Sequence, residues 1–138
     1  MKIIAALFMD DIELRSVPGP STRIDLAGIQ FSAPAPSPVP VTVAPHLVVL
    51  VWNPPDGKDV GALEVVFTNE SDSPPNDENP VEPLARNVQA LQIEPGKFNY
   101  RLVRAELPFE DYGTIIAHCS IDGGPVQVVP YTLMPPVE

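Results

Sequence analysis

The chain places a histidine directly beside its only cysteine, at His118 and Cys119. A thiol nucleophile needs a base within hydrogen-bond reach. The alternating apolar residues around this pair predict a β-strand, and neighbouring side chains on a strand point to opposite faces. We therefore expect the two side chains to diverge. Cys119 should join Ile115, Ala117 and Ile121 on the apolar face as a small buried residue.

A metal site has few candidate ligands in this sequence. His46 and His118 are the only histidines, and no H-x-H, H-x-x-E-H or C-x-x-C spacing accompanies them. The acidic run from Glu70 to Asn79 offers many oxygens but lacks the glycine-centred pattern of an EF-hand loop. We expect no metal and no other cofactor. Weak calcium association by the acidic run is the alternative, and a solvated loop is favoured over it.

Two consecutive acids, Asp10 and Asp11, follow the first apolar run. Paired carboxylates can act as general acid and base, but consecutive side chains on a strand diverge. An aspartate at a strand end also commonly accepts hydrogen bonds from nearby backbone N–H groups in a turn. We expect such a turn and keep a hydrolase using these acids as a remote alternative. The sequence thus predicts a protein that is not an enzyme.

The aromatic residues are the last candidates for a binding site. A sugar-binding platform needs aromatic side chains aligned on an exposed face, whereas Trp52 is the only tryptophan and ends the apolar run that begins at Leu47. We expect Trp52 to be a core or edge residue. A small-ligand or carbohydrate-binding module remains an alternative function. Phosphate-binding loops, nucleophile elbows and dinucleotide fingerprints are missing from the sequence.

The elements that must position these residues are predicted to be strands. Helical periodicity is nearly absent, while short runs of β-branched and aromatic residues recur between Gly, Pro, Asn and Asp. Asp56-Gly57 and Asp122-Gly123-Gly124 each predict a tight hairpin. The apolar phase changes at Gly28 and after Leu102, as in a strand that bends or crosses between sheets. The predicted strands are 2–9, 22–31, 46–52, 60–69, 88–94, 97–107, 112–121 and 126–134.

Two segments are predicted to be connections between strands. Residues 32–45 hold five prolines, which predicts an extended crossing along the outside of a sheet. Residues 70–83 combine five acids with four prolines and predict a mobile, dispensable loop. Asn79-Pro80 leaves one alternative open, a short helix running to Leu91. The predicted fold is an antiparallel β-sandwich with seven to eight strands in one domain over residues 1–138.

Composition limits the partners and the compartment. The net charge of −10 disfavours nucleic acid and anionic membranes. The apolar start of the chain ends at Asp10 without a cleavage site, so we expect a buried strand rather than a secretory signal. No apolar run is long enough to span a bilayer as a helix. A lone cysteine fits a reducing compartment, and a cytoplasmic location is expected.

Several segments, taken in order, resemble a family of small bacterial proteins of unknown function. Its members show an apolar run ending in acids, an apolar strand with an Ile-Gly pair and a late Asp-Gly hairpin. Here Ala27-Gly28-Ile29 replaces the Ile-Gly pair, and residues 70–95 have no counterpart. The resemblance implies an immunoglobulin-like β-sandwich and carries over no catalytic residue. The matching segments are Leu7-Phe8-Met9-Asp10-Asp11-Ile12-Glu13-Leu14, Arg23-Ile24-Asp25-Leu26-Ala27-Gly28-Ile29-Gln30-Phe31, Leu107-Pro108-Phe109-Glu110-Asp111-Tyr112-Gly113 and His118-Cys119-Ser120-Ile121-Asp122-Gly123-Gly124.

Two predicted strands lack a polar face. The runs from Ile3 to Met9 and from Leu47 to Trp52 present apolar side chains on both sides, although the outward side of a sandwich strand is normally polar. Something must cover the outer set. We therefore expect the chain to act through protein–protein interaction, with a homodimer as the first choice and another protein as the second.

Overall fold

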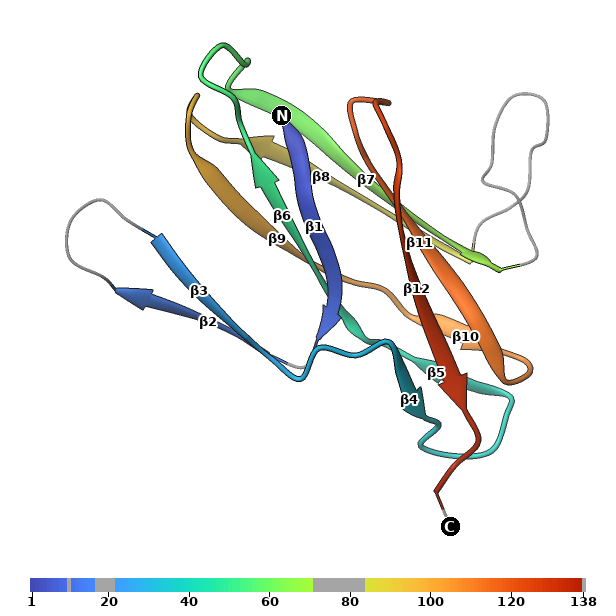
Figure 1. The fold of residues 1–138 in the computed structure, drawn as a ribbon. Helices are drawn as coiled ribbons and strands as arrows, with labels where there is room; N and C mark the ends of the chain where they lie inside the picture. Colours follow the sequence, from blue (N-terminus) through green and yellow to red (C-terminus); the bar gives the residue numbers. More distant parts are fainter. Residues whose placement is uncertain (10, 17–21, 71–83, 138) are drawn as a thin grey trace.

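The computed structural model describes residues 1–9, 11–16, 22–70 and 84–137. Within these residues the chain is all-β, with no helix and hence no helix that would cross a membrane (Figure 1). Its strands are β1 (Lys2–Met9), β2 (Asp11–Ser16), β3 (Thr22–Ala27), β4 (Ser32–Pro34), β5 (Val41–Val43), β6 (His46–Trp52), β7 (Val60–Asn69), β8 (Ala85–Gln92), β9 (Phe98–Arg104), β10 (Leu107–Phe109), β11 (Gly113–Ile121) and β12 (Gln127–Met134).

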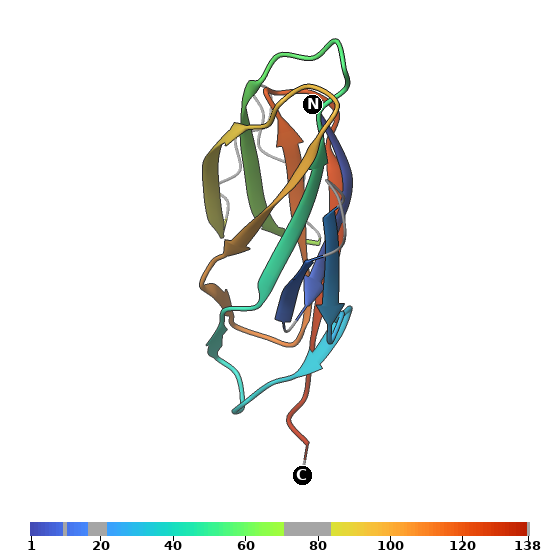
Figure 2. The ribbon, with the colours of Figure 1, turned by 90° about the vertical axis from the view of Figure 1, so that its left-hand side faces the viewer.

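Two large sheets carry most of these strands. The three-stranded sheet has the order β1-β6-β9 and is antiparallel throughout. The five-stranded sheet has the order β4-β12-β11-β7-β8. Two small sheets, β2-β3 and β5-β10, complete the fold. Figures 1 and 2 show the large sheets face to face, with the β2-β3 hairpin standing out from them on the side of the three-stranded sheet.

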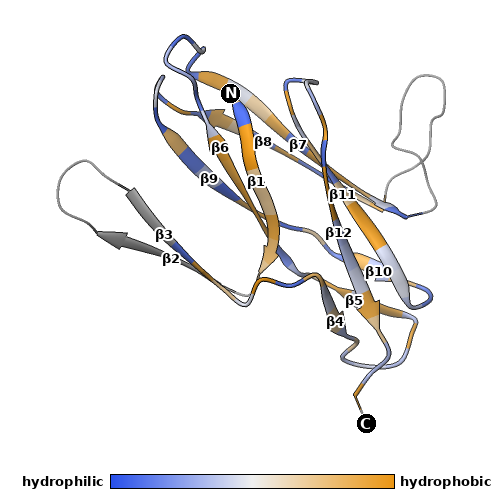
Figure 3. Cartoon of the chain, viewed as in Figure 1, coloured by the Kyte–Doolittle hydropathy of each residue, from blue (hydrophilic) through white to orange (hydrophobic). Residues whose placement is uncertain are grey.

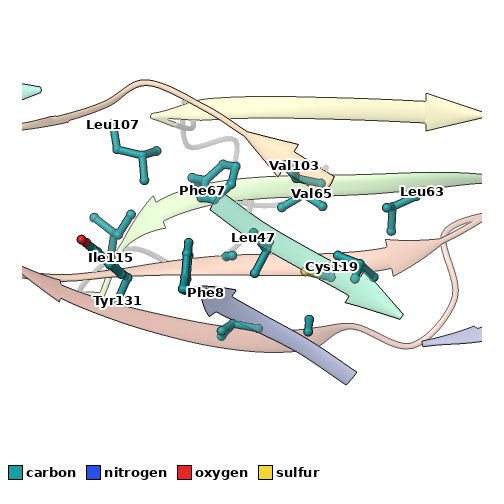
Figure 4. Close-up of a cluster of buried hydrophobic side chains, with 14 of the residues drawn as sticks. Phe8, Leu47, Leu63, Val65, Phe67, Val103, Leu107, Ile115, Cys119 and Tyr131 are labelled. Atoms are coloured by element: carbon teal, nitrogen blue, oxygen red, sulfur yellow. The ribbon is translucent and has the colours of Figure 1, made fainter. Parts of the chain in front are cut away.

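Both large sheets contribute side chains to one hydrophobic core. In β6, Leu47, Val49 and Val51 are fully buried, and every second residue of β7 and β11 faces them from the other sheet. Figure 4 shows these side chains pointing toward one another between the sheets. The rings of Phe8 and Tyr131 join the sheets with their centroids 5.0 Å apart. The alternation of apolar residues therefore faces the core as strand geometry requires.

Asn53 joins the two connections that cross between the large sheets at one end. Residues 53–59 lead from β6 to β7, and residues 93–97 lead from β8 to β9. The Asn53 N–H donates to the Lys97 carbonyl (2.8 Å), and the Asn53 carbonyl accepts from Gly96 (2.7 Å). Its Nδ2 donates to the carbonyls of Lys58 (2.8 Å) and Ile93 (2.7 Å). One buried side chain thus holds both crossings together.

The predicted hairpin at Asp56-Gly57 is wrong. The strands before and after it, β6 and β7, belong to different sheets, so the turn is part of a crossing. The hairpin at Asp122-Gly123 is confirmed. Both residues have positive φ angles of 51° and 71°, and the Gly124 N–H donates to the Ile121 carbonyl (2.9 Å), as in a type I′ turn between β11 and β12.

The expected seven to eight strands become twelve within the described residues. The proline-rich crossing at 32–45 contains β4 and β5, which are three residues each and so need few backbone donors. β4 pairs in parallel with β12, so the five-stranded sheet is mixed and the fully antiparallel prediction is corrected. Residues 85–92 form strand β8 where the alternative expected a helix to Leu91. Of the acidic loop at 70–83, residues 71–83 lie outside the described residues.

Both predicted phase changes mark breaks in the chain path. β3 ends at Ala27, Gly28 follows with φ 68°, and Gln30 then bridges to Phe8 of β1. The predicted strand 97–107 divides into β9 and β10, which lie in different sheets. Each break moves the chain from one sheet to another.

Candidate functional site

His118 and Cys119 diverge as predicted. Cys119 lies in the core with no exposed surface, and burial raises the pKa of its thiol to about 12. His118 points to the opposite face of β11, where its Nε2 lies 2.9 Å from Oγ1 of Thr68. Burial also lowers the pKa of His118, which favours the neutral imidazole in the folded protein. These two side chains do not form a nucleophile and its base.

The other candidate ligands do not gather either. His46 lies in β6 of the three-stranded sheet and His118 in β11 of the other. Across the described ranges, no group of three or more His, Cys, Asp or Glu side chains is arranged to hold a metal. Asp10 and most of the acidic run lie outside these ranges. Asp11 begins β2, and its side chain is not described.

Trp52 is neither a core nor an edge residue, contrary to the prediction. It ends β6, the central strand of its sheet, and its side chain points outward with 37% of its surface exposed. Lys2 lies opposite it on β1 and Phe98 opposite it on β9. Tyr100 lies one row further along the same side of β9, whereas Tyr131 belongs to the core. Aromatic side chains are therefore aligned on an exposed surface.

The strand register sets out this surface completely. On the side of the three-stranded sheet that faces away from the core, four rows of three residues lie across β1, β6 and β9. We call these twelve residues the outer face. Row by row they are Lys2, Trp52 and Phe98; Ala5, Leu50 and Tyr100; Leu7, Val48 and Leu102; and Met9, His46 and Arg104.

Nine residues of the outer face are apolar or aromatic, three are basic or histidine, and none is acidic, although the chain holds 18 acids. Val48 (1% exposed) and Met9 (3%) are covered, while Leu102 (44%) and Phe98 (36%) are open to solvent. β1 appears apolar along nearly its whole length in Figure 3. The exposed part of the outer face therefore lies mainly along β9 and at the Trp52 end of β6.

The outward side of the five-stranded sheet differs. There Arg86 forms an ion pair with Glu64, and the hydroxyls of Thr114 and Thr132 lie 2.7 Å apart. Exposed apolar residues such as Val88 alternate with these polar groups. The outward side of this sheet therefore mixes apolar and polar groups, including the acid Glu64. Exposed apolar residues occur on both large sheets, and the outer face differs in its aromatic residues and in its lack of acids.

Sequence reasoning found only two of the three strands that build the outer face. The runs in β1 and β6 were predicted to be apolar on both sides. The contribution of β9 was missed because the change of apolar phase after Leu102 was interpreted as a strand that bends or crosses between sheets. In the structure Val103 faces the core, whereas Phe98, Tyr100 and Leu102 face outward. Their alternation with Asn99 and Arg101 is the signal that these three side chains share one face of the strand.

Side chains close the seam between the edges of the two large sheets. Gln89 of β8 donates from Nε2 to the Leu102 carbonyl of β9 (3.0 Å). In return, Nη2 of Arg101 reaches the Ala90 carbonyl (3.5 Å). These hydrogen bonds occupy backbone carbonyls that could otherwise accept hydrogen bonds from a strand of another chain. Edge pairing at this seam is therefore disfavoured relative to contact through the outer face.

A cleft of about 500 Å³ lies at the far end of the molecule. Its lining includes Glu70, Glu110, Asp111 and Tyr112. Among the described residues, no histidine or cysteine lines it. The outer face remains the candidate functional site.

Comparisons with protein-family models, curated proteins and solved structures find no match for this chain.

Proposed function

We propose that the protein is a non-enzymatic β-sandwich module that binds another protein chain through the outer face. The observation that carries this proposal is the group of exposed side chains Trp52, Phe98 and Leu102, with the half-buried Tyr100 between them, on a face without acids. Contiguous exposed apolar patches with a polar rim often mark protein contacts, and the larger the patch, the rarer it is on a soluble monomer. Aromatic residues are also enriched, and acidic residues depleted, at interface centres.

Site-specific photocrosslinking in living cells tests this proposal. A photoreactive benzoylphenylalanine replaces Leu102 on the outer face or, as the matched control, Val128 on the outward side of the five-stranded sheet. The two side chains are similarly exposed, at 44% and 57%. We expect one discrete adduct from position 102, identified by mass spectrometry, and none from position 128. Absence of an adduct at 102, or the same adducts from both positions, contradicts the proposal.

A second candidate function is carbohydrate binding. It is favoured by Trp52 and Phe98, which lie directly opposite each other in one row, with Tyr100 in the next row. Flat aromatic surfaces of this kind can stack against sugar rings. Titration with a panel of oligosaccharides should then change Trp52 fluorescence, and Phe98→Ala should weaken the response. A panel without any change removes this candidate and leaves the protein-binding proposal in place.

We also propose that the sandwich is immunoglobulin-like. The facing sheets and the β11-β12 hairpin support an immunoglobulin-like sandwich, as the family resemblance implies. The single, fully buried Cys119 supports a reducing, cytoplasmic environment.

A further inference from the structure

We infer that the outer face binds a short acidic segment of another protein, in which apolar residues lie between acids. This inference rests on the proposed function, because it names the chemistry of the chain that the outer face binds. It follows from three observations: the unpaired cations of the outer face, the place of its exposed apolar side chains between them, and the small size of its exposed part.

The outer face carries a cation at each of its two ends. Lys2 lies in the first row, opposite Trp52, and Arg104 lies in the last row, on β9. Both residues are exposed, and neither forms an ion pair or a hydrogen bond through its side chain with any part of the chain that the structure describes. His46, the third basic residue of the outer face, already has an interaction of its own. Two cations therefore stay unpaired here, although the chain holds 18 acids.

The charge of the outer face is opposite to that of the whole chain. None of its twelve residues is acidic, so the acids that give the net charge of −10 lie elsewhere in the chain. A basic partner would be attracted to those other surfaces, and at the outer face it would meet two unpaired cations. An acidic partner meets opposite charges at the outer face, while salt screens its long-range repulsion by the rest of the chain beyond about 8–10 Å. Charge complementarity of this kind selects one partner over another, and here it selects an acidic one.

The exposed apolar side chains lie between the two cations. Phe98 and Leu102 are exposed on the outward side of β9 with the half-buried Tyr100 between them, and Trp52 lies beside Phe98. The first and last rows are six residues apart along β9, which is about 20 Å at about 3.3 Å per residue. This separation exceeds the screening length of about 8 Å at physiological salt, so each cation needs an acid of its own. A matching segment therefore has apolar residues in its middle and an acid toward each end.

The size of the outer face suits a segment rather than a folded domain. Three strands about 4.8 Å apart and seven residues long, at about 3.3 Å per residue, cover roughly 330 Å². Val48 and Met9 are already buried, so the surface open to a partner is smaller still. A stable complex of two folded proteins buries about 800 Å² on each partner. A second copy of this chain would also bring its own cations to a face that has one at each end. A single short segment therefore fits the outer face better than a second copy does.

Photocrosslinking from position 102 in cells, combined with charge reversal, tests the inference. The benzoylphenylalanine protein carries either Lys2→Glu with Arg104→Glu or, as the matched control, Lys58→Glu with Arg86→Glu. The control residues lie outside the outer face, in the crossing 53–59 and in β8, and their reversal changes the net charge by the same amount. We expect K2E/R104E to lose most of the adduct and K58E/R86E to keep it. Mass spectrometry should place the crosslink in a segment of another protein whose acids flank apolar residues.

An exchange of charges gives a second readout with purified protein. The crosslinked segment is synthesised as a peptide and titrated into the protein, with Trp52 fluorescence as the signal. K2E/R104E should bind it roughly tenfold or more weakly than the wild type, and added salt should weaken binding to the wild type. A second peptide, in which lysine replaces the flanking acids, should reverse this order and bind K2E/R104E more tightly than the wild type.

The outcomes separate this inference from the proposed function. Absence of any adduct at position 102 in the otherwise unchanged protein contradicts both. An adduct that K2E/R104E leaves at full strength, or that lies in a segment without acids or in a second copy of this chain, overturns the acidic segment and leaves the proposed function in place. Equal loss in the two double variants reports only net charge and overturns it as well. If K2E/R104E does not fold, as circular dichroism would show, K2Q/R104Q provides the same comparison against K58Q/R86Q.

Discussion

Asn53 and Gly57 show how single residues set the spacing of the two large sheets. Asn53 is fully buried, and its amide nitrogen satisfies one carbonyl from each crossing. A Cβ at Gly57 would overlap Oδ1 of Asn53. The amide could leave that position only by breaking both of its hydrogen bonds. Gly57 is therefore required for close approach to Asn53.

We expect Gly57→Ala to destabilise the protein by about 1–3 kcal/mol, the usual cost of forcing an extra methyl group into a packed site. Chemical denaturation measures this loss. Gly61→Ala is the control, because its added Cβ would meet side-chain ends at ordinary or slightly short distances: Asp122 Oδ2 at 3.1 Å, Met1 Sδ at 3.2 Å and Ile121 Cγ2 at 3.6 Å. The control should change the free energy of unfolding by less than about 0.5 kcal/mol. Equal stability of the two variants would show that the Asn53 amide is free to move.

His118 should make stability depend on pH. Burial lowers its pKa in the folded protein, so the unfolded chain takes up the proton first as the pH falls. The contribution of His118 to the free energy of unfolding should therefore be complete above the unfolded histidine pKa of about 6.5, and it should decline as the pH falls below that value. His118→Gln should show a smaller decline between pH 7.5 and 5.5 in urea denaturation. Identical pH profiles for the two proteins would contradict the role assigned to this imidazole.

At the scale of elements, strands with one buried face were predictable from sequence. β1, β6 and β7 match the predicted ranges to the residue. Their apolar runs are bounded by turn residues, and burial of at least one side sets their register. Core positions such as Cys119 follow from the same alternation. The local pattern of apolar residues was sufficient to predict a strand and its buried face wherever one side of that strand packs in the core.

Pairing between distant strands was not predictable. Asp56-Gly57 indicates a turn, but local sequence does not state which sheet the next strand joins. The three-residue strands β4 and β5 carry prolines or lie beside them, and their pairing depends on β12 and β10 rather than on their own sequence. For the same reason, the sequence predicted only part of the outer face. The apolar residues of β1 and β6 could be recognised from the local sequence of each strand. Their alignment with Phe98 and Tyr100 follows only from the ladder between β6 and β9.

The β2-β3 hairpin should be separable from the rest of the fold. Its strands pair only with each other among the described residues, and it stands away from the two large sheets. We expect replacement of residues 11–27 by a short Gly-Ser linker to change the melting temperature little. Thermal melting measures this effect. A large fall in melting temperature would show that the hairpin stabilises the core.

At the scale of the whole molecule, the two large sheets share a core but present different surfaces. The five-stranded sheet exposes the Arg86–Glu64 ion pair and hydroxyl groups between its apolar residues. The three-stranded sheet exposes an apolar surface with cations at its ends and no acid. Folding explains the buried members of the outer face, Val48 and Met9, but not its exposed aromatic and apolar residues. We propose that contact with a partner explains these.

Fluorescence of Trp52 tests this claim most directly, because Trp52 is the only tryptophan and lies on the outer face. We predict that its emission maximum shifts to shorter wavelength as the segment crosslinked at position 102 is added as a peptide from about 0.1 to about 100 µM, a range that brackets micromolar dissociation constants. Phe98→Arg on the outer face should abolish the shift, and Val88→Arg, at an exposed position of the five-stranded sheet, should preserve it. An emission maximum that stays constant throughout the titration of the wild type would contradict burial of the outer face by a partner.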